Sequence, residues 1–145
     1  MNKVTEVGSE KELIEVIEQF LPMLPHFLDK ISSLEEYATK VCKYGRVLVI
    51  KEEEAVKGFV IFYCNDLESK KSYISLIAVS DKYRRQHVGS DLVAAVENVS
   101  KDAGMQFIRL EVDNDNEGAR SFYERLGFVK VSEASESSSY MEKEV

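Results

Sequence analysis

The segment SYISLIAVSDKYRRQHVGSDLV, residues 72–93, joins an apolar run to a basic loop and then to a helical pattern. Residues 72–79 are nearly continuously apolar, which predicts a strand buried on both faces. Apolar residues then recur at helical spacing over about 88–103, and Gly104 is expected to end that helix. The next apolar segment, FIRLEV at 107–112, completes a strand–helix–strand unit. The two strands are therefore expected to be parallel, joined by a right-handed crossover.

Two helical patterns precede this unit, and a capping box opens each of them. The first, SEKELIEVIEQFL, begins at Ser9 with a glutamate three residues on, and two prolines after it are expected to break it. The second, SLEEYATKVCKYG, begins at Ser33 in the same way, and Gly45 is expected to close it. Both patterns predict short helices with one apolar face.

Two hairpins complete the pattern of elements. RVLVIK at 46–51 and KGFVIFYC at 57–64 are rich in β-forming residues and flank an acidic turn, which predicts an antiparallel hairpin. A further helix is expected over 116–126. GFVKV at 127–131 and SSYMEKEV at 138–145 predict a closing hairpin. The result is an α/β fold, a mixed sheet with helices on both faces.

The composition is that of a globular chain of ordinary size. Its 145 residues fit one domain, and 44% hydrophobic residues are enough to build a core. The net charge of −7 argues against general nucleic-acid binding, because phosphates would be repelled. The polar start MNKVTEVGSE does not resemble a signal peptide, and no apolar run reaches membrane-spanning length. We therefore expect a single cytoplasmic domain over residues 1–145, with no nucleic-acid or membrane partner.

Cysteine and histidine are too scarce for a metal site or a disulfide framework. Cys42 and Cys64 lack CxxC spacing and are expected to be reduced thiols. With only two histidines in the chain, no zinc site is predicted. His26, between Pro25 and Phe27, is expected to be a half-buried structural residue.

The basic loop after residue 79 has the features of an anion-binding turn. It joins the end of a strand to the start of a helix, where backbone N–H groups are free and the helix dipole is positive. Arg84 and Arg85 add positive charge, Gly89 permits close backbone approach, and Ser90 offers a hydroxyl. Taken alone, the loop fits equally well an ordinary strand-to-helix turn with solvated arginines.

The segment NEGARSFYERLGF, residues 116–128, favours the anion-binding alternative. Asn116 is a good helix N-cap, and Tyr123 follows it by seven residues, or two helical turns. The two side chains are therefore expected on the same face of the helix.

These two segments resemble motifs of the GNAT N-acyltransferase superfamily. YISLIAVSDKYRRQHVGSDLV is similar to its acetyl-CoA-binding segment, and NEGARSFYERLGF matches every fixed position of the following motif, N-x-x-A-x-x-F-Y-x-x-x-G-F. The resemblance covers about residues 72–131. It implies a GNAT-like, mostly antiparallel mixed sheet in which the central parallel strands splay apart. It also divides the chain into an acceptor side (1–71), an acetyl-CoA-binding half (72–131) and a closing strand (132–145).

The resemblance implies acetyl-CoA as co-substrate. Backbone groups of Ile77 and Val79 would pair with the pantetheine amides, loop N–H groups would hold the pyrophosphate, and Asn116 would touch the pantetheine arm. The implied cofactor-binding residues are Ile77, Ala78, Val79, Arg84, Arg85, Gln86, His87, Val88, Gly89, Ser90 and Asn116.

The loop departs from the family pattern at His87, which stands where the motif R-x-x-G-x-G/A has its first glycine. Glycine suits a left-handed backbone angle or very close phosphate approach. Histidine is enriched among the non-glycine residues that adopt such angles. We therefore expect His87 to be left-handed, at a strain of roughly 1–2 kcal/mol that phosphate contacts can offset.

Acetyl transfer to an amine needs a proton donor for the departing thiolate, and the family resemblance assigns that role to Tyr123. The sequence offers more than one way to remove the proton of the amine. Many members carry a glutamate on the strand before the loop, where this chain has Ser75. Glu111 on the next strand, with Asp113 behind it, is the nearest acidic candidate, and the other interpretation of both side chains is a solvated charge at the strand end. A water chain, or an acceptor amine of low pKa, would remove the need for a dedicated base.

The acceptor is expected to bind between the N-terminal helices and the first hairpin, with Tyr37, Arg46, Asn65 and Ser75 as candidate contacts. PMLPHFLDKISSLEEYATKV at 22–41 and FYCNDLESKKSYISLIAV at 62–79 resemble segments of GNAT enzymes linked to bacterial surface-sugar biosynthesis. The predicted function is therefore acetyl transfer to a primary amine of a small molecule, such as an amino sugar, by a monomer or homodimer. A protein N-terminus and a small polyamine are the alternative acceptors. The alternative is a non-catalytic acyl-CoA-binding sensor or regulatory domain.

Overall fold

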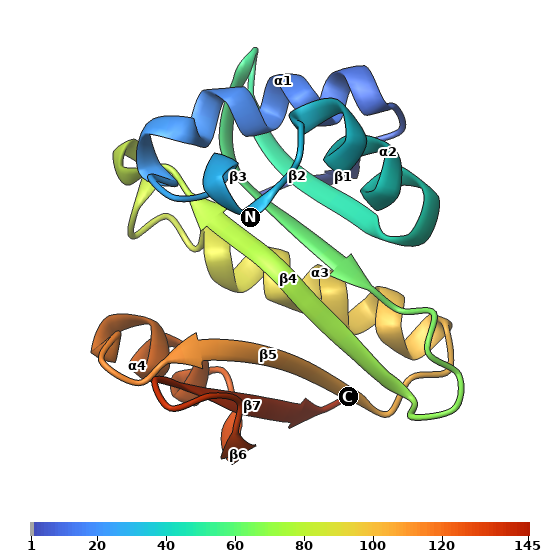
Figure 1. The fold of residues 1–145 in the computed structure, drawn as a ribbon, viewed down its shortest axis with the longest axis vertical. Coiled ribbons are helices and arrows are strands. Elements are labelled where there is room, and N and C mark those ends of the chain that lie inside the picture. Colours follow the sequence, from blue (N-terminus) through green and yellow to red (C-terminus); the bar gives the residue numbers. More distant parts are fainter. Residues whose placement is uncertain (1) are drawn as a thin grey trace.

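The computed structural model describes residues 2–145 as one seven-stranded sheet covered by helices (Figure 1). The elements are β1 (Val4–Glu6), α1 (Glu10–Phe20), α2 (Leu34–Tyr44), β2 (Arg46–Glu52), β3 (Ala55–Tyr63), β4 (Lys71–Val79), α3 (Val88–Asp102), β5 (Phe107–Asp113), α4 (Glu117–Arg125), β6 (Val129–Glu133) and β7 (Ser138–Glu144). Short 3₁₀ turns, Leu21–Met23, Leu28–Lys30 and Asp81–Tyr83, lie in the connections.

The strands follow the order β1-β2-β3-β4-β5-β7-β6. Every neighbouring pair is antiparallel except β4 and β5, which are parallel. Helix α3 makes the crossover between these two strands, as the sequence predicts for a strand–helix–strand unit. The mixed, mostly antiparallel sheet with one central parallel pair is thus confirmed.

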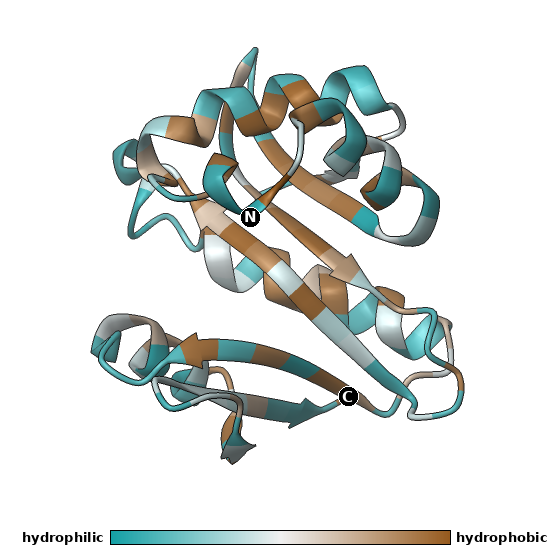
Figure 2. Cartoon of the chain, viewed as in Figure 1, coloured by the Kyte–Doolittle hydropathy of each residue, from teal (hydrophilic) through white to brown (hydrophobic). Residues whose placement is uncertain are grey.

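Each face of the sheet carries its own hydrophobic cluster. On one face, Leu13, Val16, Ile17 and Phe20 of α1 pack with α2 against β2 and β3. On the other, α3 and α4 pack against strands β2 to β5 and β7. Figure 2 shows the hydrophobic colour concentrated in the central strands and in the faces of the helices that meet them. The predicted arrangement of helices on both faces is confirmed.

A β-bulge at Ser75 divides β4 into two parts. Leu76 pairs with Ile61 of β3 and Ile74 pairs with Phe62, so Ser75 has no opposite residue in the ladder. Because side chains alternate along a strand, one inserted residue reverses which of them face each side of the sheet. Ile74 before the bulge and Ile77 and Val79 after it therefore share the α3 face.

Burial of this strand on both faces, the expectation for residues 72–79, is wrong. Only Ser72 and Ile74 are buried, Ser75 is exposed, and the residues from Leu76 to Val79 are half-buried. The strand is apolar, but after residue 73 it has no partner on its β5 side, so the last residues are left partly uncovered.

The local signals in the N-terminal half are confirmed. The Ser9 and Ser33 side chains accept hydrogen bonds from the N–H groups of Glu12 (3.1 Å) and Glu36 (3.0 Å).

The sequence did not predict β1, a three-residue edge strand paired with β2. His26 is not half-buried as expected: its side chain is 79% exposed, beside Asp29. Among the described residues no helix has the length and apolar character to cross a bilayer.

Candidate active site

The parallel strands β4 and β5 pair at only one end. Lys71, Ser72 and Tyr73 oppose Phe107, Ile108 and Arg109, and beyond these three pairs the strands diverge. Figure 1 shows the two strands side by side near the C-terminus and well separated toward α4. The divergence opens the centre of the sheet, where a parallel strand pair is normally continuous.

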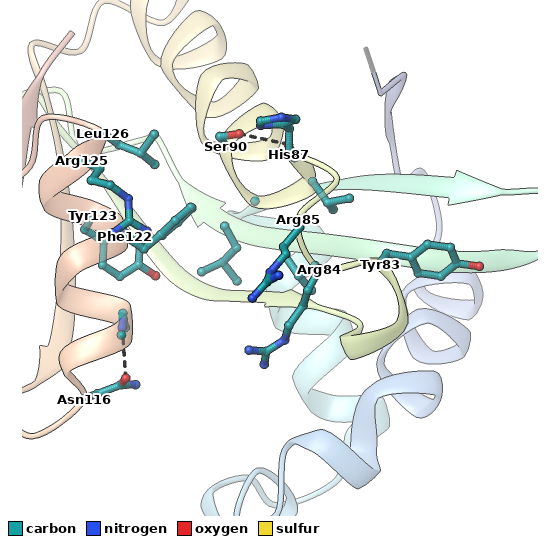
Figure 3. A pocket seen from close by; sticks show the side chains of 16 residues that line it. Tyr83, Arg84, Arg85, His87, Ser90, Asn116, Phe122, Tyr123, Arg125 and Leu126 are labelled. Atoms are coloured by element: carbon teal, nitrogen blue, oxygen red, sulfur yellow. Dashed lines mark hydrogen bonds between the residues drawn. The ribbon is translucent and has the colours of Figure 1, made fainter.

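A cavity of about 820 Å³ occupies the opened region, within the usual range for ligand sites. Its walls come from the end of β4, the loop before α3, the first turn of α3, and one face of α4 (Figure 3). The lining residues are Ile77, Val79, Tyr83, Arg84, Arg85, His87, Val88, Gly89, Ser90, Asn116, Gly118, Ala119, Phe122, Tyr123, Arg125 and Leu126.

The free edge of β4 faces this gap with unpaired backbone groups. On the other edge, the Ser80 N–H donates to the Lys57 carbonyl at 2.8 Å, which fixes the phase of the antiparallel ladder with β3. Hydrogen-bonded pairs alternate along such a ladder, so Ala78 bonds to β3 while Ile77 and Val79 direct their backbone groups toward β5. Two N–H and two C=O groups therefore point into the space between the strands.

The N-terminus of α3 forms one end of the cavity in an unusual conformation. His87, the residue before the helix, is left-handed with φ 62° and ψ 19°, as expected from the sequence. Arg85 is left-handed as well, with φ 67°. Turns in which such residues alternate gather successive N–H groups into an anion-binding concavity.

Gly58 brings this helix end close to the sheet. A Cβ atom at residue 58 of β3 would lie 2.7 Å from the Val88 Cγ1 atom and 2.9 Å from the Ala78 carbonyl. Since neither atom could be this close, only glycine allows the first turn of α3 to pack directly on the strands. The N–H groups of that turn consequently lie beside the opening of the sheet.

The four helix starts differ in a way that marks α3. Ser9, Ser33 and Asn116 each accept a hydrogen bond from the third residue of their helix, so α1, α2 and α4 are capped by their own side chains. The His87 side chain makes no such bond to α3. The first N–H groups of α3 are therefore available to a ligand, and the helix dipole favours an anion there.

Arginines surround this end of the cavity. Arg84 is paired with Asp81 at 2.7 Å, and both side chains are exposed. Arg85 lines the cavity from the loop, and Arg125 lines it from the end of α4 (Figure 3). Within residues 2–145, neither Arg85 nor Arg125 has an ion-pair partner. Their charge is therefore free to meet the phosphates of a ligand.

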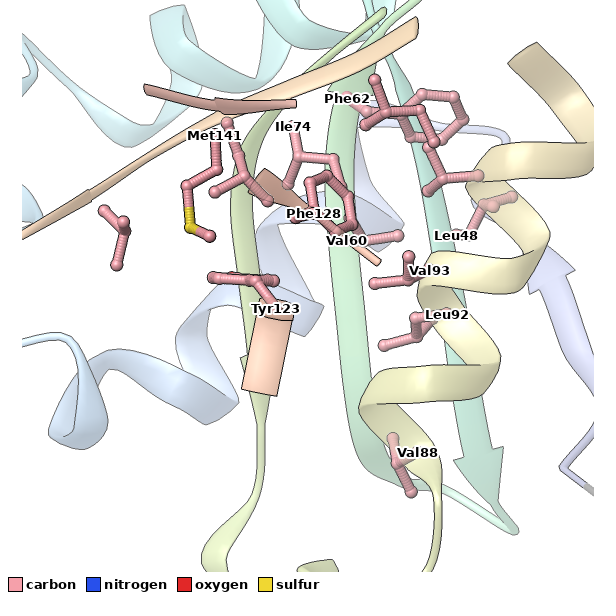
Figure 4. Close-up of a cluster of buried hydrophobic side chains, with 14 of the residues drawn as sticks. Leu48, Val60, Phe62, Ile74, Val88, Leu92, Val93, Tyr123, Phe128 and Met141 are labelled. Atoms are coloured by element: carbon pink, nitrogen blue, oxygen red, sulfur yellow. The ribbon is translucent and has the colours of Figure 1, made fainter. Parts of the chain in front are cut away.

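Tyr123 lies in the apolar part of the cavity. It is 9% exposed and packs edge-on against Phe122 and Phe128, with ring centroids 5.3 and 5.7 Å away. Figure 4 shows it in the buried cluster with Phe128, Met141 and Ile74. Burial raises the pKa of Tyr123 to about 12, so the phenol keeps its proton at neutral pH. It can serve there as a proton donor.

The structure gathers most of the predicted cofactor residues in the cavity lining. Asn116 and Tyr123 both line it, as expected from their separation by two helical turns. Ala78 and Gln86 do not line the cavity, because Ala78 packs on the α1 and α2 side and Gln86 is held from outside the loop. Sequence reasoning missed Phe122 and Arg125, although both lie in the recognised helix motif.

Glu111 lies on the opposite side of β5 from the buried residues Leu110 and Val112. Its carboxylate accepts a hydrogen bond from the Ser138 hydroxyl at 2.6 Å, and Tyr140 is its cross-strand partner. Its negative charge also contributes to raising the pKa of Tyr73, after burial as the largest cause. Glu111 thus faces the open side of the sheet that α1 and α2 do not cover.

The four candidate acceptor contacts separate into two groups. Tyr37 of α2 and Ser75 of the β4 bulge lie near each other: burial raises the pKa of Tyr37 to about 12, and the neighbouring Ser75 hydroxyl opposes that change. Arg46 instead pairs with Glu6 at 2.7 Å, and the Asn65 amide donates to the Tyr44 carbonyl at 3.0 Å. Only Tyr37 and Ser75 are brought beside the splayed strand.

The sequence of the chain also matches a known protein family. The acetyltransferase (GNAT) family model matches residues 13–128, which is most of the chain. The chain belongs to the GNAT family. The cavity therefore lies where the two recognised motifs, residues 72–93 and 116–128, meet in a GNAT fold. Within residues 2–145 no three His, Cys, Asp or Glu side chains gather as a metal ion would require.

Three similar proteins extend the comparison of this GNAT chain. N-alpha-acetyltransferase 30 of Schizosaccharomyces pombe is 45% identical over 60 residues, covering 41% of this chain and 40% of that protein. A GNAT-family protein of Desulfovibrio desulfuricans superposes with a TM-score of 0.80 at 14% identity, over 99% of each chain. An acetyltransferase of Bacillus anthracis, solved with acetyl coenzyme A, is 27% identical with a TM-score of 0.63, covering 70% of this chain and 63% of that one. The match to the yeast relative thus spans less than half of its length.

Proposed function

We propose that the chain is an acetyl-CoA-dependent N-acetyltransferase that moves the acetyl group directly to a primary amine in a ternary complex. The observation that carries the proposal is the cavity between β4 and β5, which joins an uncapped helix N-terminus to a buried tyrosine. The first feature suits a pyrophosphate, and the second suits a thiolate that must be protonated.

The cofactor would lie along the cavity with its pyrophosphate at the α3 end and its thioester at the α4 end. The N–H groups from Arg85 to Ser90 would hold the pyrophosphate, supported by the charge of Arg85. The free backbone groups of Ile77 and Val79 would pair with the pantetheine amides, as a missing strand would. This direction brings the thioester toward Tyr123.

Transfer requires one bond to form and one to break. The amine nitrogen attacks the thioester carbonyl carbon, the C–N bond forms, and the C–S bond breaks to release a thiolate. Tyr123 donates its proton to that sulfur, because its raised pKa keeps it protonated until then. Free N–H groups at the splay can stabilise the oxyanion that develops on the carbonyl oxygen.

The attacking amine must lose a proton, and Glu111 is the proposed general base that takes it. The carboxylate is exposed on the side of the sheet opposite the cofactor helices, where an acceptor can approach. Its hydrogen bond from Ser138 fixes its orientation without replacing its negative charge. Glu111→Gln keeps the size of the side chain and removes the base, while Asp113→Asn changes a carboxylate two residues away as a matched control.

The acceptor is proposed to be a primary amine bound beside Tyr37 and Ser75. An α-amine of a protein or peptide is the first class to test, because the yeast relative is named an N-alpha-acetyltransferase. A small-molecule amine such as an amino sugar is the second class, carried by the resemblance of the N-terminal segments. The two differ in whether activity needs a peptide chain after the amine.

The test is release of free CoA from acetyl-CoA in the presence of peptide N-termini, amino sugars and polyamines. Turnover that depends on one acceptor class, and falls at least tenfold in Glu111→Gln but not in Asp113→Asn, supports the enzyme. Tight acetyl-CoA binding with no turnover on any amine would instead support a non-catalytic acyl-CoA sensor. Absence of both binding and turnover would contradict each proposal.

A further inference from the structure

Gln86 occupies the centre of the strained loop before α3. It lies between the left-handed residues Arg85 (φ 67°) and His87 (φ 62°), and its own φ is negative. Left-handed angles are unfavourable for residues with a side chain, so this alternation needs support from outside the loop. Two residues from other parts of the chain, Asn2 and Lys57, reach Gln86 and supply this support.

Asn2 holds the loop from the side of β1. Its amide nitrogen donates to the Gln86 carbonyl at 2.8 Å and to Asp91 Oδ2 at 2.9 Å. Its backbone N–H donates to the same Asp91 oxygen at 3.2 Å. One side chain therefore ties the centre of the loop to the fourth residue of α3.

The bonds from Asn2 also hold the Asp91 carboxylate in place. A carboxylate in the first turn of a helix adds negative charge close to the site where an anion would bind. Asp91 does not line the cavity, and its Oδ2 accepts two hydrogen bonds from Asn2. The link therefore fixes the carboxylate outside the cavity.

Lys57 of β3 holds the other side of the same loop. Its ammonium group donates to Gln86 Oε1 at 3.3 Å and lies 5.3 Å from the centre of the Tyr83 ring. Its carbonyl accepts from the Ser80 N–H at 2.8 Å, where the loop begins. Gln86 is thus bonded by Asn2 through its backbone and by Lys57 through its side chain.

We propose that Asn2 and Lys57 are positioning residues that keep the loop of residues 83–87 in its anion-binding conformation. Neither residue lines the cavity, so both act through Gln86. The inference rests on the proposed function, because it assigns the support for the pyrophosphate part of that site. It places the support on the N-terminal half of the chain, outside both recognised motifs.

The experiment is calorimetric titration of the full chain with CoA, dephospho-CoA and pantetheine. Dephospho-CoA keeps the pyrophosphate, whereas pantetheine has no phosphate. Asn2→Ala and Lys57→Met are each expected to weaken binding of CoA and dephospho-CoA by roughly three- to tenfold, the effect of the one hydrogen bond to Gln86 that each variant loses. Pantetheine affinity is expected to stay the same, which a general loss of structure would not allow.

Gln19→Ala is the matched control. Its side-chain oxygen also accepts a backbone hydrogen bond from β3, the Val56 N–H at 3.2 Å, but it does so from α1, on the face of the sheet opposite α3. It should change none of the three affinities.

Equal losses for all three ligands, or no loss in either variant, would overturn the positioning role while leaving the proposed function in place. If the unmodified chain binds dephospho-CoA no better than pantetheine, the cavity has no pyrophosphate site. The proposed function and the positioning role then fail together.

Discussion

The two ends of the cavity differ in almost every physical property. At the α3 end, exposed arginines and an uncapped helix N-terminus present positive charge to solvent. At the α4 end, Tyr123 is buried among aromatic rings. A charged ligand gains most of its binding free energy at the α3 end and very little at the α4 end. Affinity and chemistry are therefore separated in space, and changes at each end should affect different constants.

Removing the phenol at the buried end should have the largest effect. Tyr123→Phe keeps the ring and its packing but loses the proton donor, so kcat is expected to fall about 10²- to 10⁴-fold. CoA affinity should stay within about twofold, since the phosphates bind at the other end. Steady-state kinetics and calorimetry measure the two quantities. Tyr44→Phe, at an exposed tyrosine on α2, is the control.

An unchanged kcat in Tyr123→Phe would remove the general acid from the mechanism. A parallel loss of CoA affinity would show that the two ends are not independent.

Adding negative charge at the open end should weaken binding without harming the fold. Ser90 is the third residue of α3 and lines the cavity. Ser90→Asp is expected to lower CoA affinity at least tenfold through repulsion of the phosphates. The same charge suits a helix N-terminus, so the melting temperature should hold or rise. Ser90→Asn has the same shape without the charge and should cost no more than about threefold.

Similar affinities for Ser90→Asp and Ser90→Asn would mean that electrostatics at this helix end do not bind the ligand.

Alkaline pH should destabilise the folded protein through Tyr123, at the buried end of the cavity. The folded protein keeps the Tyr123 proton to about pH 12, whereas an unfolded tyrosine loses it near pH 10. The stabilisation is full below pH 10 and is lost as pH rises toward 12. The free energy of unfolding should then fall by about 1.4 kcal/mol per pH unit because of this group. Denaturant unfolding at several pH values should show a shallower slope for Tyr123→Phe. Identical slopes would contradict the raised pKa.

The smallest effect is expected at His87. Glycine removes the cost of the left-handed angle, roughly 1–2 kcal/mol. It also loses more conformational entropy on folding, which costs about 0.5–1 kcal/mol. His87→Gly should therefore stabilise the protein by less than about 1 kcal/mol and raise CoA affinity by at most a few-fold. Thermal unfolding and calorimetry measure both. A clear loss of affinity would instead show that the imidazole itself contacts the ligand.

Local sequence signals accounted for the parts of the site that depend on neighbouring residues. The serine caps follow from short-range chemistry, and so does the shared face of Asn116 and Tyr123. The left-handed angle at His87 was expected from the glycine that the family motif has there. In each case the deciding interaction spans fewer than eight residues.

The missed features depend on contacts between distant segments. The bulge at Ser75 is a difference in register between β3 and β4, and no residue nearby signals it. The half-exposed end of β4 follows from its divergence from β5. The Asn2 link spans 84 residues to Gln86 and 89 to Asp91. Pairing over such distances is set by the whole fold, and local pattern does not carry it.

The free edge of β4 has a consequence for amide hydrogen exchange. A strand at the centre of a sheet normally exchanges slowly along its whole length, because both edges are bonded. Here the N–H of Ala78 points to β3, whereas those of Ile77 and Val79 point into the gap. Neighbouring amides of one central strand should therefore exchange at very different rates. Slowing of only the two gap-facing amides when CoA is added would record, residue by residue, the ligand completing the sheet.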